Sequence, residues 1–279
     1  MIHEHDSLPI VRIRPAKRAL DLNLRELWEY RDLLVFLAWR DITVRYKQTL
    51  LGAAWAIIQP LFSMVVFTIF FGRLAGIPSD GTAYPVFTYV ALLPWQYFAA
   101  AMTQSSNSLV GSSTLLTKVY FPRLVIPLSA VLPPLVDFAI ALVVLLGLMV
   151  GYRVAPTVNV VLLPAFLLVA VVAALGVGLW LSALNVPYRD VRYAVPFLVQ
   201  FWMFASPVVY GSGLVPAEWR VLYGLNPMTG VIEGFRWALL GTGPGPGAMT
   251  AVSVASALLL LLSGLAYFRR MERTFADVV

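Results

Sequence analysis

The sequence has no cysteine and only two histidines, His3 and His5. The absence of cysteine excludes disulfides, thiolate metal sites and cysteine nucleophiles. Because both histidines lie near the N-terminus, the apolar part of the chain has no imidazole for metal binding or proton relay. Lys17, Lys47 and Lys118 each follow a residue other than glycine, which excludes the Gly-Lys pair of a phosphate-binding loop.

Charged residues are also scarce, since they make up 12% of the chain while hydrophobic residues make up 60%. Soluble globular domains carry about 25% charged residues. Together with a mean hydropathy of +0.81, this contrast predicts an integral membrane protein. The charge-free stretches are residues 48–72, 81–117, 154–188, 193–217 and 237–268, together with 124–152, which Asp137 alone interrupts.

These stretches predict an all-α fold in which residues 48–279 form a domain of six transmembrane helices. Crossing a hydrocarbon core of about 30 Å takes about 20 helical residues. We place the spans near residues 53–72, 86–108, 126–150, 159–184, 193–210 and 248–268. Sixteen of the 20 Lys and Arg residues then fall on the side of the two termini, which predicts that both termini are cytoplasmic.

The N-terminal part carries charges every few residues, so it is not expected to cross the membrane. We expect residues 1–23 to form a cytoplasmic tail and residues 24–47 to form an amphipathic helix in the membrane interface. A soluble helix packed on a partner is the alternative. Arg40, Arg45 and Lys47 lie where this segment meets the first span, on the predicted cytoplasmic side.

The last connection on the predicted outer side contains a short helix. Asn226 followed by Pro227 is typical of a helix start, and Gly241 is typical of a residue that ends one. Such a helix is too short to cross the bilayer. We therefore expect re-entrant or interfacial helices within residues 216–240, and the alternative is a surface helix that only covers the bundle.

A few polar residues fall inside the apolar stretches. Asp137 follows Pro133 and Pro134, so a kink could open a polar pocket around it, although a purely structural partner is equally plausible. The run at residues 103–108 is too polar to face lipid, so it should face another helix or a water-filled path.

Aromatic residues near the ends of the spans admit two interpretations. They form an aromatic belt at the membrane interfaces, or some of them line a path on which sugar rings stack. The candidates for a channel lining or gate are Trp95, Tyr97, Asn107, Trp202 and Tyr210, together with Glu233 and Arg236, which are spaced to pair on one helix.

A pump of this composition needs an energy source on another subunit, because the chain has no phosphate-binding loop and little charge at membrane depth. The best candidate contact for such a subunit is the loop at residues 111–123. Ser112 or Ser113 could cap a short helix there and present Lys118 and Arg123 at the membrane face. The alternative is an ordinary interfacial turn whose basic residues only set the orientation.

Several motifs resemble those of one transporter family. They are RDITVRYKQTLLGAAWAIIQP at residues 40–60, TKVYFPR at 117–123, NVPYRDVRY at 185–193, SPVVY at 206–210, and LNPM with EGFR inside 225–236. In this order they are similar to the membrane subunit of ABC-2 type transporters that export bacterial polysaccharides such as O antigen, teichoic acid and capsule. The resemblance runs from about Leu24 to the C-terminus.

The resemblance implies a homodimer of six-span subunits, with the fold of type V exporters, in the bacterial cytoplasmic membrane. It implies two separate ATPase subunits that bind ATP and Mg²⁺, no cofactor in this chain, and a lipid-linked glycan rather than nucleic acid as the further partner. Arg40, Arg45 and Lys47 would then compensate the charge of a lipid pyrophosphate. A coupling helix would lie near residues 112–120, and the residues expected to contact the ATPase are Ser112, Thr117, Lys118, Tyr120 and Arg123.

Two other functions stay open. One is an ABC-2 exporter of a small lipophilic compound or drug. The other is a membrane-embedded glycosyltransferase or phosphotransferase acting on polyprenyl lipids, which would need clustered acidic residues at the membrane face for metal and base chemistry. Asp41 and Asp190 are isolated in the sequence, which disfavours an enzyme.

Overall fold

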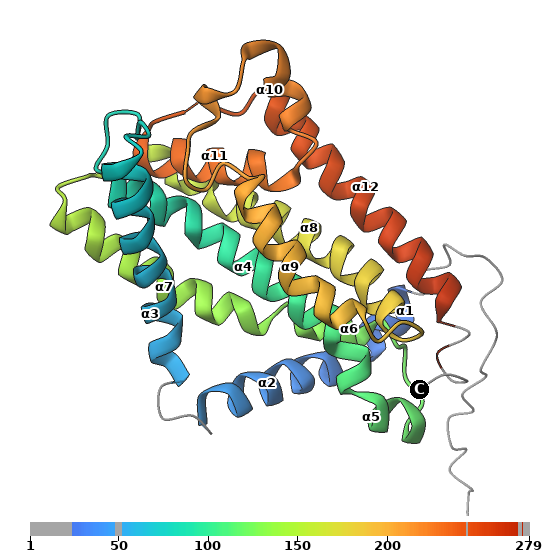
Figure 1. The fold of residues 1–279 in the computed structure, drawn as a ribbon. Helices are drawn as coiled ribbons and strands as arrows, with labels where there is room; N and C mark the ends of the chain where they lie inside the picture. Colours follow the sequence, from blue (N-terminus) through green and yellow to red (C-terminus); the bar gives the residue numbers. More distant parts are fainter. Residues whose placement is uncertain (1–23, 48–51, 244, 273–274, 276–279) are drawn as a thin grey trace, which may run out of the picture.

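The computed structural model describes residues 24–47, 52–243, 245–272 and 275. All regular elements in this part of the chain are helices, and no strand occurs in it. Long helices run side by side, with shorter helices at both ends of the bundle (Figure 1). The predicted all-α fold is therefore confirmed, while the predicted tail at residues 1–23 lies outside the described residues.

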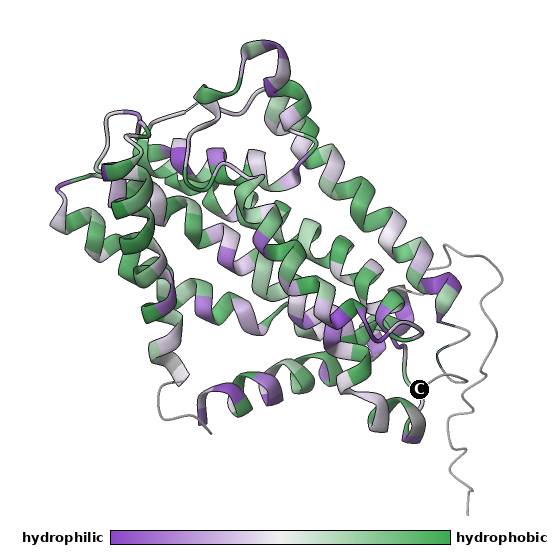
Figure 2. Cartoon of the chain, viewed as in Figure 1, coloured by the Kyte–Doolittle hydropathy of each residue, from purple (hydrophilic) through white to green (hydrophobic). Residues whose placement is uncertain are grey.

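One end of the bundle carries α1 (Leu24–Glu29), α2 (Arg31–Lys47) and α5 (Ser113–Lys118) and is called the α2 end below (Figure 1). Leu37 and Ala38 of α2 are buried, whereas Phe36 and Trp39 expose more than half of their surface. Hydrophilic and hydrophobic residues alternate along α2, while the long helices are mostly hydrophobic (Figure 2). Exposed aromatic and charged side chains on one helix fit the predicted interfacial position.

Six helical stretches correspond in position to the predicted spans. They are α3 (Gly52–Phe67) with the π-helix η1 (Thr68–Leu74), α4 (Tyr84–Gly111), α6 (Val125–Ala130) with α7 (Pro133–Gly151), the 3₁₀ helix η2 (Val158–Leu162) with α8 (Leu163–Asn185), α9 (Val191–Phe204), and α12 (Ala248–Met271). The break between α6 and α7 falls directly before Pro133, where the two prolines predict a kink.

Four stretches in the described part are long and apolar enough to cross a membrane, namely Ala54–Leu74, Val125–Gly151, Val158–Asn185 and Ala248–Met271. Helix α4 is long, at 28 residues, but contains the polar run near its end. Helix α9 has only 14 residues and ends at Phe204, where the chain turns. Pro207 follows this turn, and the ring of a proline disfavours helical backbone at the residue before it. Helix α9 is thus shorter than the predicted span 193–210, and the number of six crossings stays a prediction.

The other end of the bundle carries the 3₁₀ helix η3 (Ser212–Leu214), α10 (Ala217–Tyr223) and α11 (Pro227–Leu240), and is called the α10 end (Figure 1). The side chain of Asn226 accepts a hydrogen bond from the backbone N–H of Met228, and Gly241 follows the helix with φ +71°. A positive φ at this position favours glycine. Both predicted boundaries of α11 are therefore confirmed.

Helices α8 and α12 approach each other closely through glycine. A Cβ added to Gly176 would lie 2.6 Å from the backbone nitrogen of Leu261, so only glycine fits without moving α12. Gly264 of α12 faces Gly176 in turn. Small residues at helix contacts are typical of membrane bundles, where packing rather than the hydrophobic effect drives association.

Apolar side chains from distant segments meet at the α2 end. Leu37 of α2, Leu109 of α4, Val186 after α8 and Phe268 of α12 belong to one buried cluster. This packing brings basic residues of four segments to the same end of the bundle. The segments are α2, the 118–123 region, the 189–192 turn and the α12 terminus.

Candidate functional site

A cavity of about 630 Å³ lies among α3, α4, α7 and α9. Its aromatic lining residues are Trp55, Trp95, Tyr97 and Phe138. Its amide lining residues are Gln59, Gln96, Gln104 and Gln200, which come from three different helices. Flat aromatic rings beside side-chain amides suit a ligand that has both apolar ring faces and hydroxyl groups.

Two opposite charges face each other on the wall of this cavity. Arg45 at the end of α2 forms an ion pair with Asp137 of α7, with Nη1 and Oδ2 at 2.8 Å. The hydroxyl of the neighbouring Tyr46 donates a hydrogen bond to Oδ1 of Asp137. Burial, together with this hydrogen bond, raises the pKa of Tyr46 above its ordinary value, so the hydroxyl keeps the proton that it donates. Asp137 is therefore contacted by two donors from the end of α2, the charged guanidinium of Arg45 and the neutral hydroxyl of Tyr46.

The other basic residues predicted to face a lipid pyrophosphate lie elsewhere. Arg40 forms an ion pair with its neighbour Asp41 at 2.8 Å on the exposed side of α2, and Lys47 is exposed at the end of the helix. Of these three, the structure brings only Arg45 to the cavity.

The polar run at residues 103–108 has two faces, one of which contacts another helix, as predicted, while the other borders the cavity. Thr103 and Gln104 line the cavity. Ser105 is buried against Gly178 of α8, and the side chain of Asn185 donates to the backbone oxygen of Ser106 and to Asn107. The run thus joins α4 to α8 on one side and presents polar atoms to the cavity on the other.

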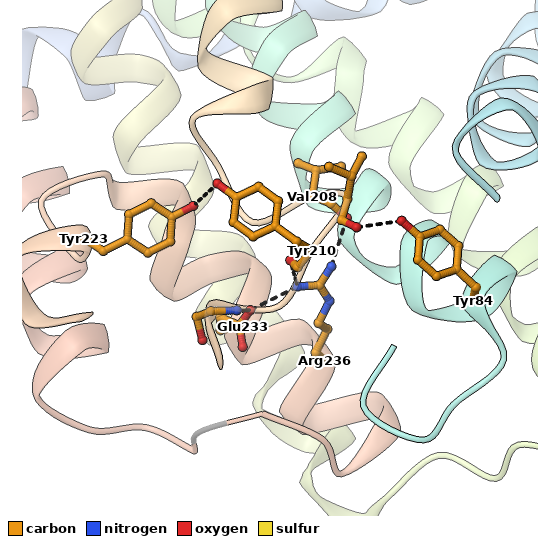
Figure 3. Close-up of polar contacts among 8 residues, drawn as sticks. Tyr84, Val208, Tyr210, Tyr223, Glu233 and Arg236 are labelled. Carbon is orange, nitrogen blue, oxygen red and sulfur yellow. Dashed lines mark hydrogen bonds and ion pairs between the residues drawn. The ribbon is translucent and has the colours of Figure 1, made fainter. Parts of the chain in front are cut away.

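A second charged pair lies at the α10 end, where Arg236 and Glu233 of α11 are fully buried and 3.0 Å apart (Figure 3). This contact confirms the pairing predicted from their spacing. The guanidinium of Arg236 also donates to the backbone oxygens of Val208 and Tyr210 and lies over the ring of Phe87, 3.7 Å from its centroid.

The partners of this pair show that it holds the segment between α9 and η3. Glu233 accepts a hydrogen bond from the backbone N–H of Ser212, and Tyr84 of α4 donates to the backbone oxygen of Val209 (Figure 3). The hydroxyls of Tyr210 and Tyr223 lie 2.9 Å apart. Glu233 and Arg236 therefore fix the course of a loop inside this chain and do not line the cavity among α3, α4, α7 and α9.

The remaining predicted lining residues separate into two places. Trp95 and Tyr97 lie on the cavity. Trp202 donates to the side chain of Asn226 and borders a second, apolar pocket between α9 and α10. Asn107 and Tyr210 are held by the contacts described above.

The residues predicted to contact an ATPase lie in or beside α5 at the α2 end. Ser112 precedes the helix, Thr117 lies in it, and Lys118 and Tyr120 are exposed. Arg123 instead donates to the backbone oxygen of Glu272 and lies 6.0 Å from the ring centroid of Phe275. It therefore ties the 118–123 region to the C-terminal segment.

Sequence reasoning included Gln104 in the polar run but missed the other amides of the cavity, Gln59, Gln96 and Gln200. Gln96, Thr103 and Gln104 recur at helical spacing on one face of α4, and Gln59 and Ser63 do so on α3. This periodic polar stripe on an otherwise apolar helix is a signal that could have been found. The contact between Arg45 and Asp137 has no such signal, because the two residues are far apart in the sequence.

Long apolar helices around a cavity of mixed polar and apolar lining define the chain as a multi-pass α-helical membrane protein. Residues 32–240 match the ABC-2 type transporter family. The chain belongs to this family, as its motifs predict, and is a membrane subunit without an ATPase domain of its own.

Similar proteins cover almost the whole chain. The O-antigen export system permease protein RfbA of Myxococcus xanthus is 31% identical over 92% of this chain and 98% of its own length. A Klebsiella pneumoniae protein of the same name is 29% identical over 89% of this chain and 95% of its length. The polysialic acid transport protein KpsM of Escherichia coli is 21% identical over 84% of this chain and 91% of its length.

The buried pair at the α10 end yields a stability prediction. Replacing Arg236 with Met leaves the carboxylate of Glu233 buried without its charged partner, which costs about 3–5 kcal/mol. We expect the double variant Glu233→Gln with Arg236→Met to lose less stability than Arg236→Met alone. The free energy of unfolding in mixed micelles, titrated with sodium dodecyl sulfate, measures the difference.

The control is Arg25→Ala, which removes one partner of the exposed pair between Arg25 and Glu29 and should stay near wild type. A double variant that is as unstable as Arg236→Met would show that the charge of Glu233 is not what makes the single change costly.

Proposed function

We propose that this chain is the transmembrane subunit of an ATP-driven transporter that exports a lipid-linked cell-surface polysaccharide across the bacterial cytoplasmic membrane. The observation that carries the proposal is the similarity to an O-antigen export permease, which is 31% identical and matched over 98% of its length. The cavity agrees with such a cargo, because rings of Trp55, Trp95 and Tyr97 beside glutamine amides suit sugar units.

The subunit works as a homodimer with two ATPase subunits, which bind ATP and Mg²⁺. The exposed apolar side chains of α3 and α9 support the proposal of a second copy. Val195 is the only buried residue of α9, and Phe197, Phe201 and Phe204 on it expose 47–70% of their surface. A second copy that covers these faces would close the cavity between α3 and α9 into a channel.

The α2 end faces the cytoplasm and the ATPase in this proposal, with six spans and both termini on that side. Basic residues of four separate segments meet at this end, as the positive-inside rule expects. Helix α5 acts as the coupling helix through Lys118 and Tyr120, while Arg123 holds it to the C-terminal segment. The α10 and α11 helices close the outer end, braced by Glu233 and Arg236.

The cargo is tested with the permease and its ATPase partner in proteoliposomes. We expect lipid-linked glycan to stimulate ATP hydrolysis and to become accessible to a glycan-cleaving enzyme on the far side of the membrane. Stimulation by small lipophilic compounds without glycan transport would contradict the proposal and favour a drug exporter. Glycosyl or phosphoryl transfer without ATP would favour an enzyme.

The orientation is tested by single-cysteine labelling, since the chain has no native cysteine. We expect a membrane-impermeant thiol reagent to modify Glu218→Cys in α10 on intact cells, because Glu218 is exposed at the α10 end. Lys118→Cys in α5 should react only after the membrane is permeabilised. Labelling of Lys118→Cys on intact cells would reverse the orientation.

The coupling role of α5 predicts a defect in energy use. Lys118→Ala removes an exposed charge from the proposed ATPase contact, so the amount of glycan moved per ATP hydrolysed should fall several-fold. Arg189→Ala, which removes an exposed charge from a turn near the same end, is the matched control and should couple normally. Equal coupling in the two variants would remove Lys118 from the mechanism.

A further inference from the structure

Arg45 and Asp137 are the only charged side chains among the described residues that line the cavity. Their charges cancel, so the cavity wall carries no net charge while they are paired. Both remain accessible, since the side chain of Arg45 is 41% exposed and that of Asp137 is 20% exposed. The pair therefore differs from Glu233 and Arg236, which are sealed inside the protein.

A guanidinium binds carboxylates and phosphates with the same planar, forked arrangement of donors. Asp137 thus occupies the position on Arg45 that a phosphate oxygen would take. Because both side chains are partly exposed, separating them costs less than separating the sealed pair of Glu233 and Arg236, so an anion with more charge can replace the carboxylate. The diphosphate group of a lipid carrier is such an anion, and Arg45 lies at the α2 end, where the proposed orientation places the carrier headgroup.

Helix α2 does not depend on this ion pair for its position. Leu37 of α2 is buried at 3% exposure in the apolar cluster of the α2 end. Tyr46 also keeps a hydrogen bond to Asp137 that does not require Arg45. The guanidinium can therefore leave the carboxylate while α2 stays packed and Asp137 keeps one donor.

We propose that Asp137 is a built-in competitor for the diphosphate of the lipid carrier at Arg45. Without substrate, Asp137 holds the guanidinium; an arriving diphosphate displaces it, and the carboxylate returns when the headgroup leaves. The inference rests on the proposed function, because the diphosphate belongs to the lipid-linked cargo. It makes Asp137 a positioning residue that limits diphosphate affinity and so favours release.

The test measures binding of farnesyl diphosphate to the permease–ATPase complex in nanodiscs, with wild type, Asp137→Asn, Arg45→Gln and the double variant. Removing the competitor should tighten binding about fivefold or more, and Arg45→Gln should weaken it by a similar factor. The double variant should bind like Arg45→Gln, because Asp137 acts only through Arg45. This non-additivity separates competition from a general change in charge.

Three variants serve as controls. Asp137→Glu keeps the negative charge and should bind like wild type. Arg40→Gln removes a guanidinium that is also paired with a carboxylate on α2 but lies away from the cavity, and it should leave the affinity unchanged. Tyr46→Phe removes the hydroxyl that donates the second hydrogen bond to Asp137. It should therefore also change the affinity for farnesyl diphosphate, because the carboxylate then depends on Arg45 alone. It carries the test if Asp137→Asn does not fold.

Two further ligands identify the recognised group. Inorganic diphosphate should bind more weakly than farnesyl diphosphate but show the same dependence on Asp137, which distinguishes a free anion from a lipid headgroup. Farnesol, which has no charge, should show no dependence on Asp137.

Farnesyl diphosphate that binds Asp137→Asn and wild type equally, or binds Asp137→Asn more weakly, would overturn the competitor role while leaving polysaccharide export intact. A wild-type complex that neither binds farnesyl diphosphate nor transports lipid-linked glycan would overturn both the inference and the proposed function.

Discussion

Moving a charge from water into a helical bundle costs several kcal/mol of solvation free energy, and the attraction of an opposite charge has to offset this cost. Among the pairs that meet this constraint in the described part of the chain are Arg45 with Asp137 near one end and Arg236 with Glu233 near the other. The second pair is sealed and fixes a loop through backbone oxygens. The first borders a cavity. The same chemistry thus gives a permanent brace where water is excluded and an exchangeable contact where it is not.

Features that depend on neighbouring residues could be predicted from the sequence. The charge-free runs indicated the long helices, and the Asn226-Pro227 pair and Gly241 indicated the bounds of α11, because caps are local structures. For Trp95 and Tyr97 the sequence left an aromatic belt and a path both open, and the structure places them on the cavity wall. The partner of Asp137 could not be predicted, because it depends on how α2 and α7 pack in three dimensions.

The α2 end joins parts of the chain that are distant in sequence. The region after α5 is tied by Arg123 to Glu272 beyond α12, and α2, α4, α8 and α12 share one apolar cluster there. A displacement of α5 would therefore change the contacts of α2 and of three long helices, α4, α8 and α12, at the same time. This connection offers a physical route by which a partner at this end could influence the cavity, whose wall includes the last turn of α2.

The close approach of α8 and α12 at Gly176 has a consequence for the shape of the cavity. Backbones in direct contact leave no side chains between them that could adjust, so a shift of α8 relative to α12 is sterically opposed, and the largely buried α4 packs against α8. By contrast, α9 buries one residue and much of α3 is exposed. The cavity is thus bounded on one side by tightly packed helices and on the other by α3 and α9, whose faces are exposed in a single copy, so the width left for a polymer would be set by how a second copy covers them.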